Sequence, residues 1–285
     1  MENNIKDFWQ THPCGADLVG DLNEETRAEY EDFFDRYDDY RYWTEPHILS
    51  NLDMIDFSGK GVLEIGLGQG ADAEQIARRG GMFCGVDLTE EAVKRTKMRF
   101  SMHDLSYERI EQASALDLPF ADDSFDIVFS HGVLHHIPEI KLAEKEIFRV
   151  LKPTGELVVM LYAKRSLNYL VSISVLRRLG LLGLYGLGIR PGGIYRDHLD
   201  NARKVGIWNY LSMKNFINVS TDGPFSPYSK VYSLNDVRAD FPHFEIGKID
   251  RHFMHAPPLK VKWLPLAGLL GWHLWVWMKP RKDVS

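Results

Sequence analysis

The sequence has few cysteines and no long apolar run, and these absences exclude several protein classes. Cys14 and Cys84 are the only two cysteines among 285 residues, too few for a disulfide framework and without the spacing of a metal site. No stretch of 18 apolar residues occurs, so we expect no transmembrane span. The first residues lack the basic and then apolar order of a secretory signal. We therefore expect a cytoplasmic protein, and a peripheral membrane contact stays open.

Charge is divided unevenly along the chain. The net charge is −6, but residues 1–159 carry 16 basic and 32 acidic side chains, whereas residues 160–285 carry 18 and 8. The acidic first half argues against nucleic acid as a partner. The basic second half admits an anionic substrate, a membrane surface or the acidic half itself. We expect a small-molecule substrate, and a homodimer is left open.

Strands and helices alternate strictly from Gly61 onward. This order predicts βαβ units, a parallel sheet and helices on both of its faces. The fold class is therefore α/β, a doubly wound, mostly parallel seven-stranded sheet. The expected strands are 62–65, 82–87, 109–114, 125–129, 156–161, 244–249 and 273–278.

Four segments follow from this pattern. Residues 1–57 form an N-terminal helical lid, 58–163 the cofactor-binding core, 164–235 an inserted helical cap, and 236–285 the part that completes the sheet. Thr89 is placed to cap a helix that runs to about Met102. A further helix is expected over 259–270, and the sheet is expected to be mixed at its last strand.

A glycine-rich turn follows the first strand. Gly66, Gly68 and Gly70 let the backbone approach a ligand closely, and Asp87 ends the second strand, where an acidic side chain can accept hydrogen bonds from a ribose diol. The turn also resembles a dinucleotide fingerprint. However, the carboxylate of Glu64 beside it would repel a pyrophosphate and attract a sulfonium or ammonium group.

Residues 61–161 resemble a class I S-adenosylmethionine-dependent methyltransferase of the small-molecule branch that includes quinone-biosynthesis enzymes. The resemblance rests on the order and spacing of several segments. These are Leu63 to Gly70, Gly85 to Leu88, Leu118 to Phe120, Phe125 to Val128, Gly132 to Pro138 and Leu151 to Gly155. It implies S-adenosyl-L-methionine as the cofactor and methyl transfer to an O, N or C nucleophile of a small, partly apolar molecule.

The resemblance also implies roles for single residues. Ser114 stands where the family usually has Asp, so a neutral hydroxyl would meet the adenine amino group. His131 and His135, and after them His136, are candidates for a general base, because an imidazole titrates near neutral pH. The expected cofactor-binding residues are Glu64, Gly66, Leu67, Gly68, Gly70, Asp87, Leu88, Ser114, Ala115, Ser130 and Tyr42.

The lid and the cap are the segments expected to contact the methyl-accepting substrate. Tyr37 to Tyr42 are expected to fold over the cofactor, or else to pack as core aromatics. Tyr40, Tyr195, Arg196 and His198 are the candidate substrate residues, although the cap is equally well explained as a dimer interface. The H-x-x-H pair at 252–255 is interpreted as core or surface histidines, and no metal is expected.

Two alternatives to an active methyltransferase stay open. The first is a catalytically silent module that kept the cofactor fold, which the sequence does not exclude because methyl transfer needs no obligatory catalytic side chain. A nicotinamide-dependent oxidoreductase is disfavoured by Glu64 and by the later methyltransferase-like segments.

Overall fold

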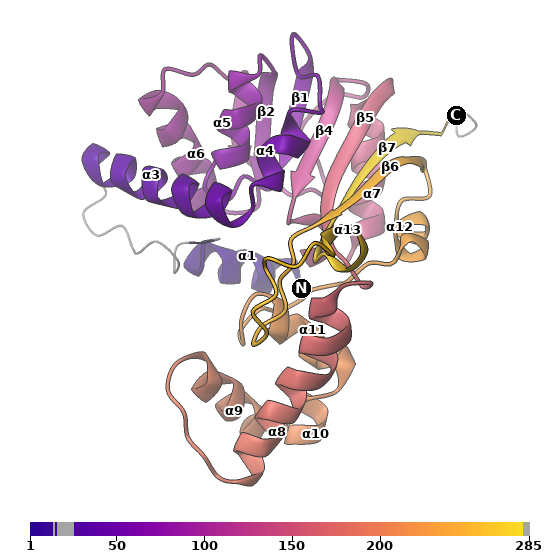
Figure 1. The fold of residues 1–285 in the computed structure, drawn as a ribbon. Coiled ribbons are helices and arrows are strands. Elements are labelled where there is room, and N and C mark those ends of the chain that lie inside the picture. Colours follow the sequence, from indigo (N-terminus) through magenta and orange to yellow (C-terminus); the bar gives the residue numbers. More distant parts are fainter. Residues whose placement is uncertain (14, 16–25, 282–285) are drawn as a thin grey trace.

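A computed structural model describes residues 1–13, 15 and 26–281. Its centre is a seven-stranded sheet in the order β3-β2-β1-β4-β5-β7-β6 (Figure 1), with β7 antiparallel to both of its neighbours. The strands are β1 Gly61–Ile65, β2 Met82–Asp87, β3 Arg109–Gln112, β4 Phe125–His131, β5 Leu151–Tyr162, β6 Phe244–His252 and β7 His273–Pro280. The α/β fold with a mixed last strand is confirmed.

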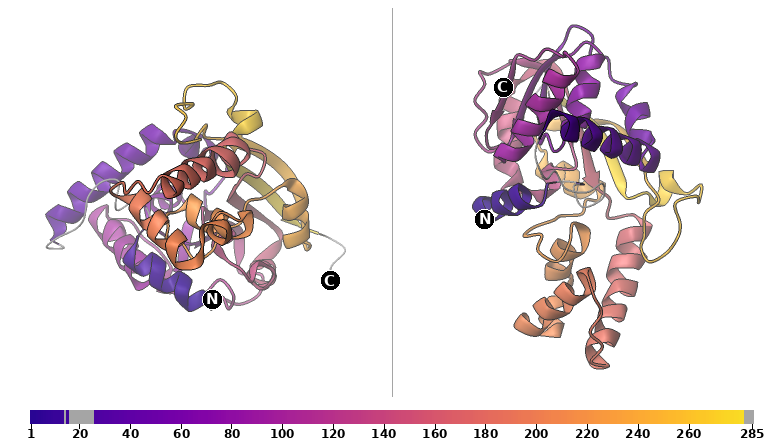
Figure 2. Two further views of the ribbon diagram at one scale, coloured as in Figure 1. Left: turned by 90° about the horizontal axis from the view of Figure 1, so that it is seen from below. Right: turned by 90° about the vertical axis from the view of Figure 1, so that its left-hand side faces the viewer.

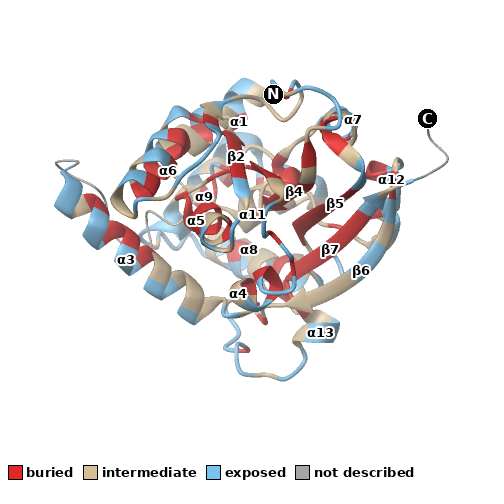
Figure 3. Ribbon diagram, turned by 90° about the horizontal axis from the view of Figure 1, so that it is seen from above, coloured by how far each residue is buried: buried red, intermediate tan, exposed pale blue. Residues whose placement is uncertain are grey.

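The sheet is buried on both faces because its strands are apolar at successive positions. In β5, Leu157 and Val159 belong to one hydrophobic cluster, while Val158 and Met160 belong to the cluster on the opposite face. This period of two is the side-chain alternation of a strand. The central strands are accordingly the most buried part of the fold (Figure 3).

Helices of the N-terminal and central parts cover the sheet. One cluster includes residues of α4, α5 and α6, and the other includes residues of α7 and α12. Thr89 caps α6 as expected, accepting a hydrogen bond from the Ala92 N–H at 3.4 Å. The helices are α1 Glu2–Thr11, α3 Arg27–Thr44, α4 His47–Leu52, α5 Ala71–Arg78, α6 Glu90–Met102, η1 Leu134–His136, α7 Ile140–Val150 and α12 Leu234–Asp240.

The segment between β5 and α12 extends away from the sheet and has its own small core (Figures 1 and 2). Ile173, Leu181, Leu199 and Phe216 form this core together with Trp272, which precedes β7. The helices here are η2 Asn168–Arg177, which is a π-helix, α8 Arg178–Gly186, α9 Ile194–Val205, α10 Ile207–Tyr210 and α11 Met213–Thr221.

The prediction of a helix over residues 259–270 is wrong for most of that range. Only α13, Ala267–Leu270, is helical. Pro265 explains the difference, since a proline lacks the N–H that a helix interior requires and restricts the residue before it. Strand β5 also begins earlier than expected, at Leu151.

Candidate active site

The glycine turn after β1 has a conformation that requires glycine. Gly66, Gly68 and Gly70 have φ angles of +86°, +52° and +74°. A Cβ on Gly66 would lie 2.1 Å from a methyl carbon of Val133. The turn therefore brings bare backbone against the loop after β4 and leads directly into α5.

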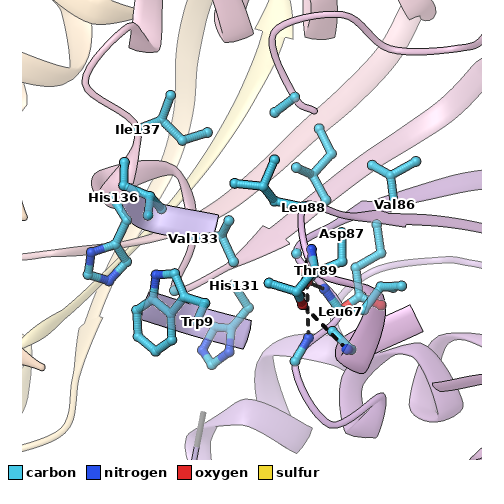
Figure 4. A pocket seen from close by; sticks show the side chains of 18 of the residues that line it. Trp9, Leu67, Val86, Asp87, Leu88, Thr89, His131, Val133, His136 and Ile137 are labelled. Carbon is cyan, nitrogen blue, oxygen red and sulfur yellow. Dashed lines mark hydrogen bonds between the residues drawn. The ribbon is translucent and has the colours of Figure 1, made fainter. Parts of the chain in front are cut away.

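Asp87 is held rigidly at the end of β2. One carboxylate oxygen, Oδ2, accepts the Leu67 N–H at 2.8 Å, and Oδ1 accepts both the backbone N–H and the hydroxyl of Thr89 at 2.8 Å. Burial raises the pKa of Asp87, while these hydrogen bonds oppose that rise. Figure 4 shows Asp87 beside Leu88 and Leu67 on one side of a cavity.

Glu64 is a buried carboxyl with an unsatisfied oxygen. Its side chain is 1% exposed, and its Oε2 has no hydrogen-bond partner. Burial raises the pKa of Glu64 well above its ordinary value; the charge of Asp72 adds to this rise and Arg41 opposes it. A buried carboxyl without a partner is costly, so Glu64 is poised for a donor or cation in the cavity that it lines.

One cavity of about 250 Å³ joins these residues. The cofactor residues expected from the sequence that line it are Glu64, Gly66, Leu67, Gly68, Asp87, Leu88, Ser114 and Ala115. On the other side it reaches Trp9, His131 and His136 (Figure 4). Gly70, the last glycine of the turn, is instead packed against Thr96 of α6.

Helix α1 covers the cavity together with Tyr37 and Arg41, which belong to the segment that the sequence offered as a lid or as core packing. Its residues Glu2, Ile5 and Trp9 line the cavity. Ser114 Oγ donates a hydrogen bond to Glu2, and Gln10 Oε1 accepts the Glu90 N–H at 3.0 Å. Helix α1 is thereby fastened at both of its ends to the core that it covers.

Arg41, Asp72 and His131 form a compact polar group in the cavity wall. The guanidinium of Arg41 donates to Asp72 Oδ2 at 2.6 Å, and Nδ1 of His131 lies 3.1 Å from the same oxygen. Burial alone would raise the pKa of Asp72, but Arg41 and His131 hold it well below its ordinary value. Nε2 of His131 has no hydrogen-bond partner.

His136 is the cavity histidine with the best-defined protonation geometry. Its Nδ1 lies 2.8 Å from the carbonyl oxygen of Tyr228, which can only accept, so this nitrogen carries the hydrogen. Its Nε2 then presents a lone pair, has no hydrogen-bond partner and lies 3.5 Å from Asp222 Oδ2. The indole of Trp9 meets the imidazole edge-on, with ring centroids 5.2 Å apart. Asp222 and Tyr228 both come from the insertion.

Several residues expected at the site do not line this cavity in the described structure. Ser130 donates to the Ile65 carbonyl inside the sheet, and Tyr42 reaches the carbonyl of Ala71. His135 is buried against the Tyr162 ring at 3.8 Å, and burial lowers the pKa of this imidazole well below its ordinary value.

The substrate candidates also lie outside the lining. Tyr40 and Tyr195 are exposed, at 39% and 52%. Arg196 lies on the exposed side of α9, and His198 is buried in the insertion, bonded to Tyr210 at 2.6 Å. The sequence did not indicate Trp9, Asp72, Asp222 or His273, because each reaches the cavity from a different segment. His136, by contrast, was among the candidate bases, as the second histidine of the Gly132 to Pro138 segment.

Comparison with known proteins agrees with the fold. Residues 63–159 match the family model of a methyltransferase domain. The chain is 26% identical over 197 residues to a ubiquinone biosynthesis O-methyltransferase of Pseudomonas entomophila, which spans 66% of this chain and 79% of the relative.

Two further similar proteins show how far the similarity extends. Phosphoethanolamine N-methyltransferase 2 of Caenorhabditis elegans is 33% identical over 120 residues, and the match spans 40% of this chain but only 28% of that relative. The crystal structure of a SAM-dependent methyltransferase from Aquifex aeolicus superposes with a TM-score of 0.52 at 14% identity, over 90% of this chain and 100% of the other. Within the described residues, no helix has both the length and the apolar character to cross a membrane.

Proposed function

Because the chain belongs to the class I S-adenosylmethionine-dependent methyltransferases, we propose that it transfers a methyl group to an O, N or C nucleophile of a small, partly apolar molecule. The observation that carries this proposal is the pairing of Glu64 and Asp87 on one cavity. The Glu64 carboxyl has an oxygen without a hydrogen-bond partner, and the Asp87 carboxyl is held in place by hydrogen bonds. A cationic nucleoside requires one such group at each of its two ends.

The residues present fit the cofactor. Glu64 Oε2 lacks a partner, and Gly68 has open space where a Cβ would stand, so the backbone of the turn can be approached closely. We assign Glu64 and the turn to the methionine part, Asp87 to the ribose, and Leu88, Ser114 and Ala115 to the adenine. When bound, S-adenosylmethionine supplies a methyl group already activated on a sulfonium sulfur.

The acceptor side favours a neutral or cationic molecule over an anionic one. Among the described lining residues the only side chain with a permanent positive charge is Arg41, and Asp72 already pairs with it. The acidic lining residues Glu139 and Asp222 would repel an anion. An apolar body would contact Ile5, Trp9, Leu116, Ile137 and Met160.

The His136–Asp222 pair supplies a general base for this acceptor. The Tyr228 carbonyl fixes the tautomer with a free lone pair on Nε2, and the Asp222 carboxylate stabilises the imidazolium that forms when Nε2 takes a proton. Binding near this lone pair orients the nucleophile, which is the main requirement of methyl transfer. His131 is the second candidate, with its Nδ1 held by Asp72. His135, enclosed behind Tyr162, is not retained as a base.

A catalytically silent module is the alternative, and turnover separates the two functions. The appearance of S-adenosylhomocysteine in the presence of an acceptor excludes the silent module. Glu64 disfavours a nicotinamide cofactor, whose pyrophosphate it would repel. A cytoplasmic location remains a prediction from the sequence, as does the assignment of residues 164–235 as a substrate cap.

Calorimetric titration with S-adenosylhomocysteine tests the cofactor assignment. Asp87→Ala should weaken binding by at least about tenfold, because a preorganised hydrogen-bonding carboxylate contributes roughly 1.5–3 kcal/mol. Asp117→Ala is the matched control, since Asp117 is exposed and lies outside the cavity lining. Equal affinity of the Asp87 variant and the wild type would remove the assignment.

A further inference from the structure

Histidines from separate segments gather on one wall of the cavity. His131 ends β4 and His273 begins β7, with ring centroids 6.0 Å apart. Behind them, His47 stacks on His252 at 4.8 Å, and His47 Nε2 lies 3.1 Å from His273 Nδ1.

Glu45 completes a set of ligands with two of these histidines. One donor atom each of Glu45, His131 and His273 lie within 4.8 Å of one another, and all three residues line the cavity. The carboxylate of Glu45 is 3.7 Å from His273 Nδ1. Donors around a zinc ion, with bonds of about 2.1 Å, are roughly 3.4 Å apart, so a modest closure of the side chains would bring them onto one ion.

The surroundings of His131 are those of a metal ligand. The side chain is 5% exposed, Nδ1 lies 3.1 Å from Asp72 Oδ2, and Nε2 has no partner. Both polar neighbours of the ring, Asp72 and Arg41, are therefore on the Nδ1 side, and Nε2 is the nitrogen left for an ion. The nearby charge of Arg41, 2.8 Å from His131 Nδ1, is balanced by its pair with Asp72.

We propose that Glu45, His131 and His273 bind a first-row divalent transition-metal ion in the wall of the cavity. Two imidazoles and one carboxylate favour such an ion over Mg²⁺ or Ca²⁺, which prefer oxygen ligands. Three protein ligands leave coordination positions open, and the cavity lies on that side. An acceptor oxygen bound there would become more acidic; this role, unlike metal binding itself, rests on the proposed function.

Cobalt and zinc titrations of the chelator-treated full chain test the site. We expect the wild type to bind one Zn²⁺ per chain by calorimetry and to develop visible absorption with Co²⁺. Glu45→Gln and His131→Gln should each weaken binding at least about tenfold. His255→Gln, a histidine of the same region outside the ligand set, should match the wild type, and Mg²⁺ should produce no saturable heat.

The contradicting results are clear. Absence of stoichiometric Zn²⁺ binding, or equal affinity in all four proteins, would overturn the metal site. Thermal melting of each variant shows whether it is folded. Titrating S-adenosylhomocysteine into metal-free protein separates the two proposals, because zinc binding without cofactor binding leaves the metal site standing and removes the proposed function, while the reverse result does the opposite.

Discussion

The two sides of the cavity are built in different ways. The donor side comes from one stretch of chain, Gly61 to Ala115, whose strands and turns are neighbours in sequence. The acceptor side is assembled from α1, the α3–α4 junction, the ends of β4 and β5, the insertion and the start of β7. In the proposed function the donor side binds the cofactor, which is common to the family, whereas the acceptor side changes with any of six separate segments.

The largest expected effect is on the acceptor side. His136→Gln should lower kcat by about 10²–10⁴-fold, the usual contribution of a general base, and leave cofactor affinity unchanged. Asp222→Asn should also lower kcat, but by a smaller factor, because it removes only the charge that stabilises the imidazolium. Steady-state kinetics with an acceptor turned over by the wild type provide the measurement.

His198→Gln is the control for that comparison. His198 is a histidine of the insertion that lies outside the cavity lining, so kcat should stay within roughly twofold of the wild type. Equal losses in the His136 and His198 variants would mean that the insertion acts only through overall stability.

The next effect concerns the glycine turn of the donor side. Gly68→Ala places a side chain in open space at positive φ, which costs about 1–2 kcal/mol. Gly66→Ala adds a clash with Val133 and should cost about 2–4 kcal/mol in all. Urea unfolding compares the two directly, and a larger loss in the Gly68 variant would show that the turn is packed differently.

The smallest expected effect concerns the buried carboxyl of Glu64, whose Oε2 has no hydrogen-bond partner. Because folding raises the pKa of Glu64, the folded chain keeps this proton to higher pH than the unfolded chain. This group therefore makes stability fall as pH rises above about 4.3. Arg41 opposes this loss, and Asp72 and Asp87 increase it. Glu64→Gln should gain about 1 kcal/mol at pH 7 without ligand and bind S-adenosylmethionine about tenfold more weakly.

Glu108→Gln, at an exposed position, controls for a general effect of removing one negative charge. Unfolding and calorimetry from pH 5 to pH 8 would show both changes. A Glu64 variant that is less stable than the wild type and binds equally well would contradict this account of the donor side.

The sequence predicted the donor side because its signals are local. A strand, a glycine turn and an acidic strand end follow one another, and Glu64, Asp87, Leu88 and Ser114 all line the cavity. The seven strands were likewise predicted, since most of them are short apolar runs bounded by turns. Ser130 was misplaced because the direction of a side chain at a strand end depends on the pleat rather than on its position in the motif.

The acceptor side could not be predicted in the same way. Asp222 lies in an Asp-Gly-Pro turn that by itself indicates only a turn, and its place beside His136 depends on how the whole insertion folds back. Trp9 and His273 are 264 positions apart in the chain and meet one cavity only in the folded state. No periodicity or spacing encodes such a contact.

A crystal structure of the full chain with S-adenosylhomocysteine tests the central claim most directly, namely that one cavity holds the nucleoside between Glu64 and Asp87 and presents its sulfur to His136. We predict the ribose hydroxyls on Asp87, the adenine beside Leu88 and Ser114, and the sulfur facing the Trp9 and His136 side. A nucleoside bound outside this cavity, or reversed so that its adenine lies against His136, would contradict it.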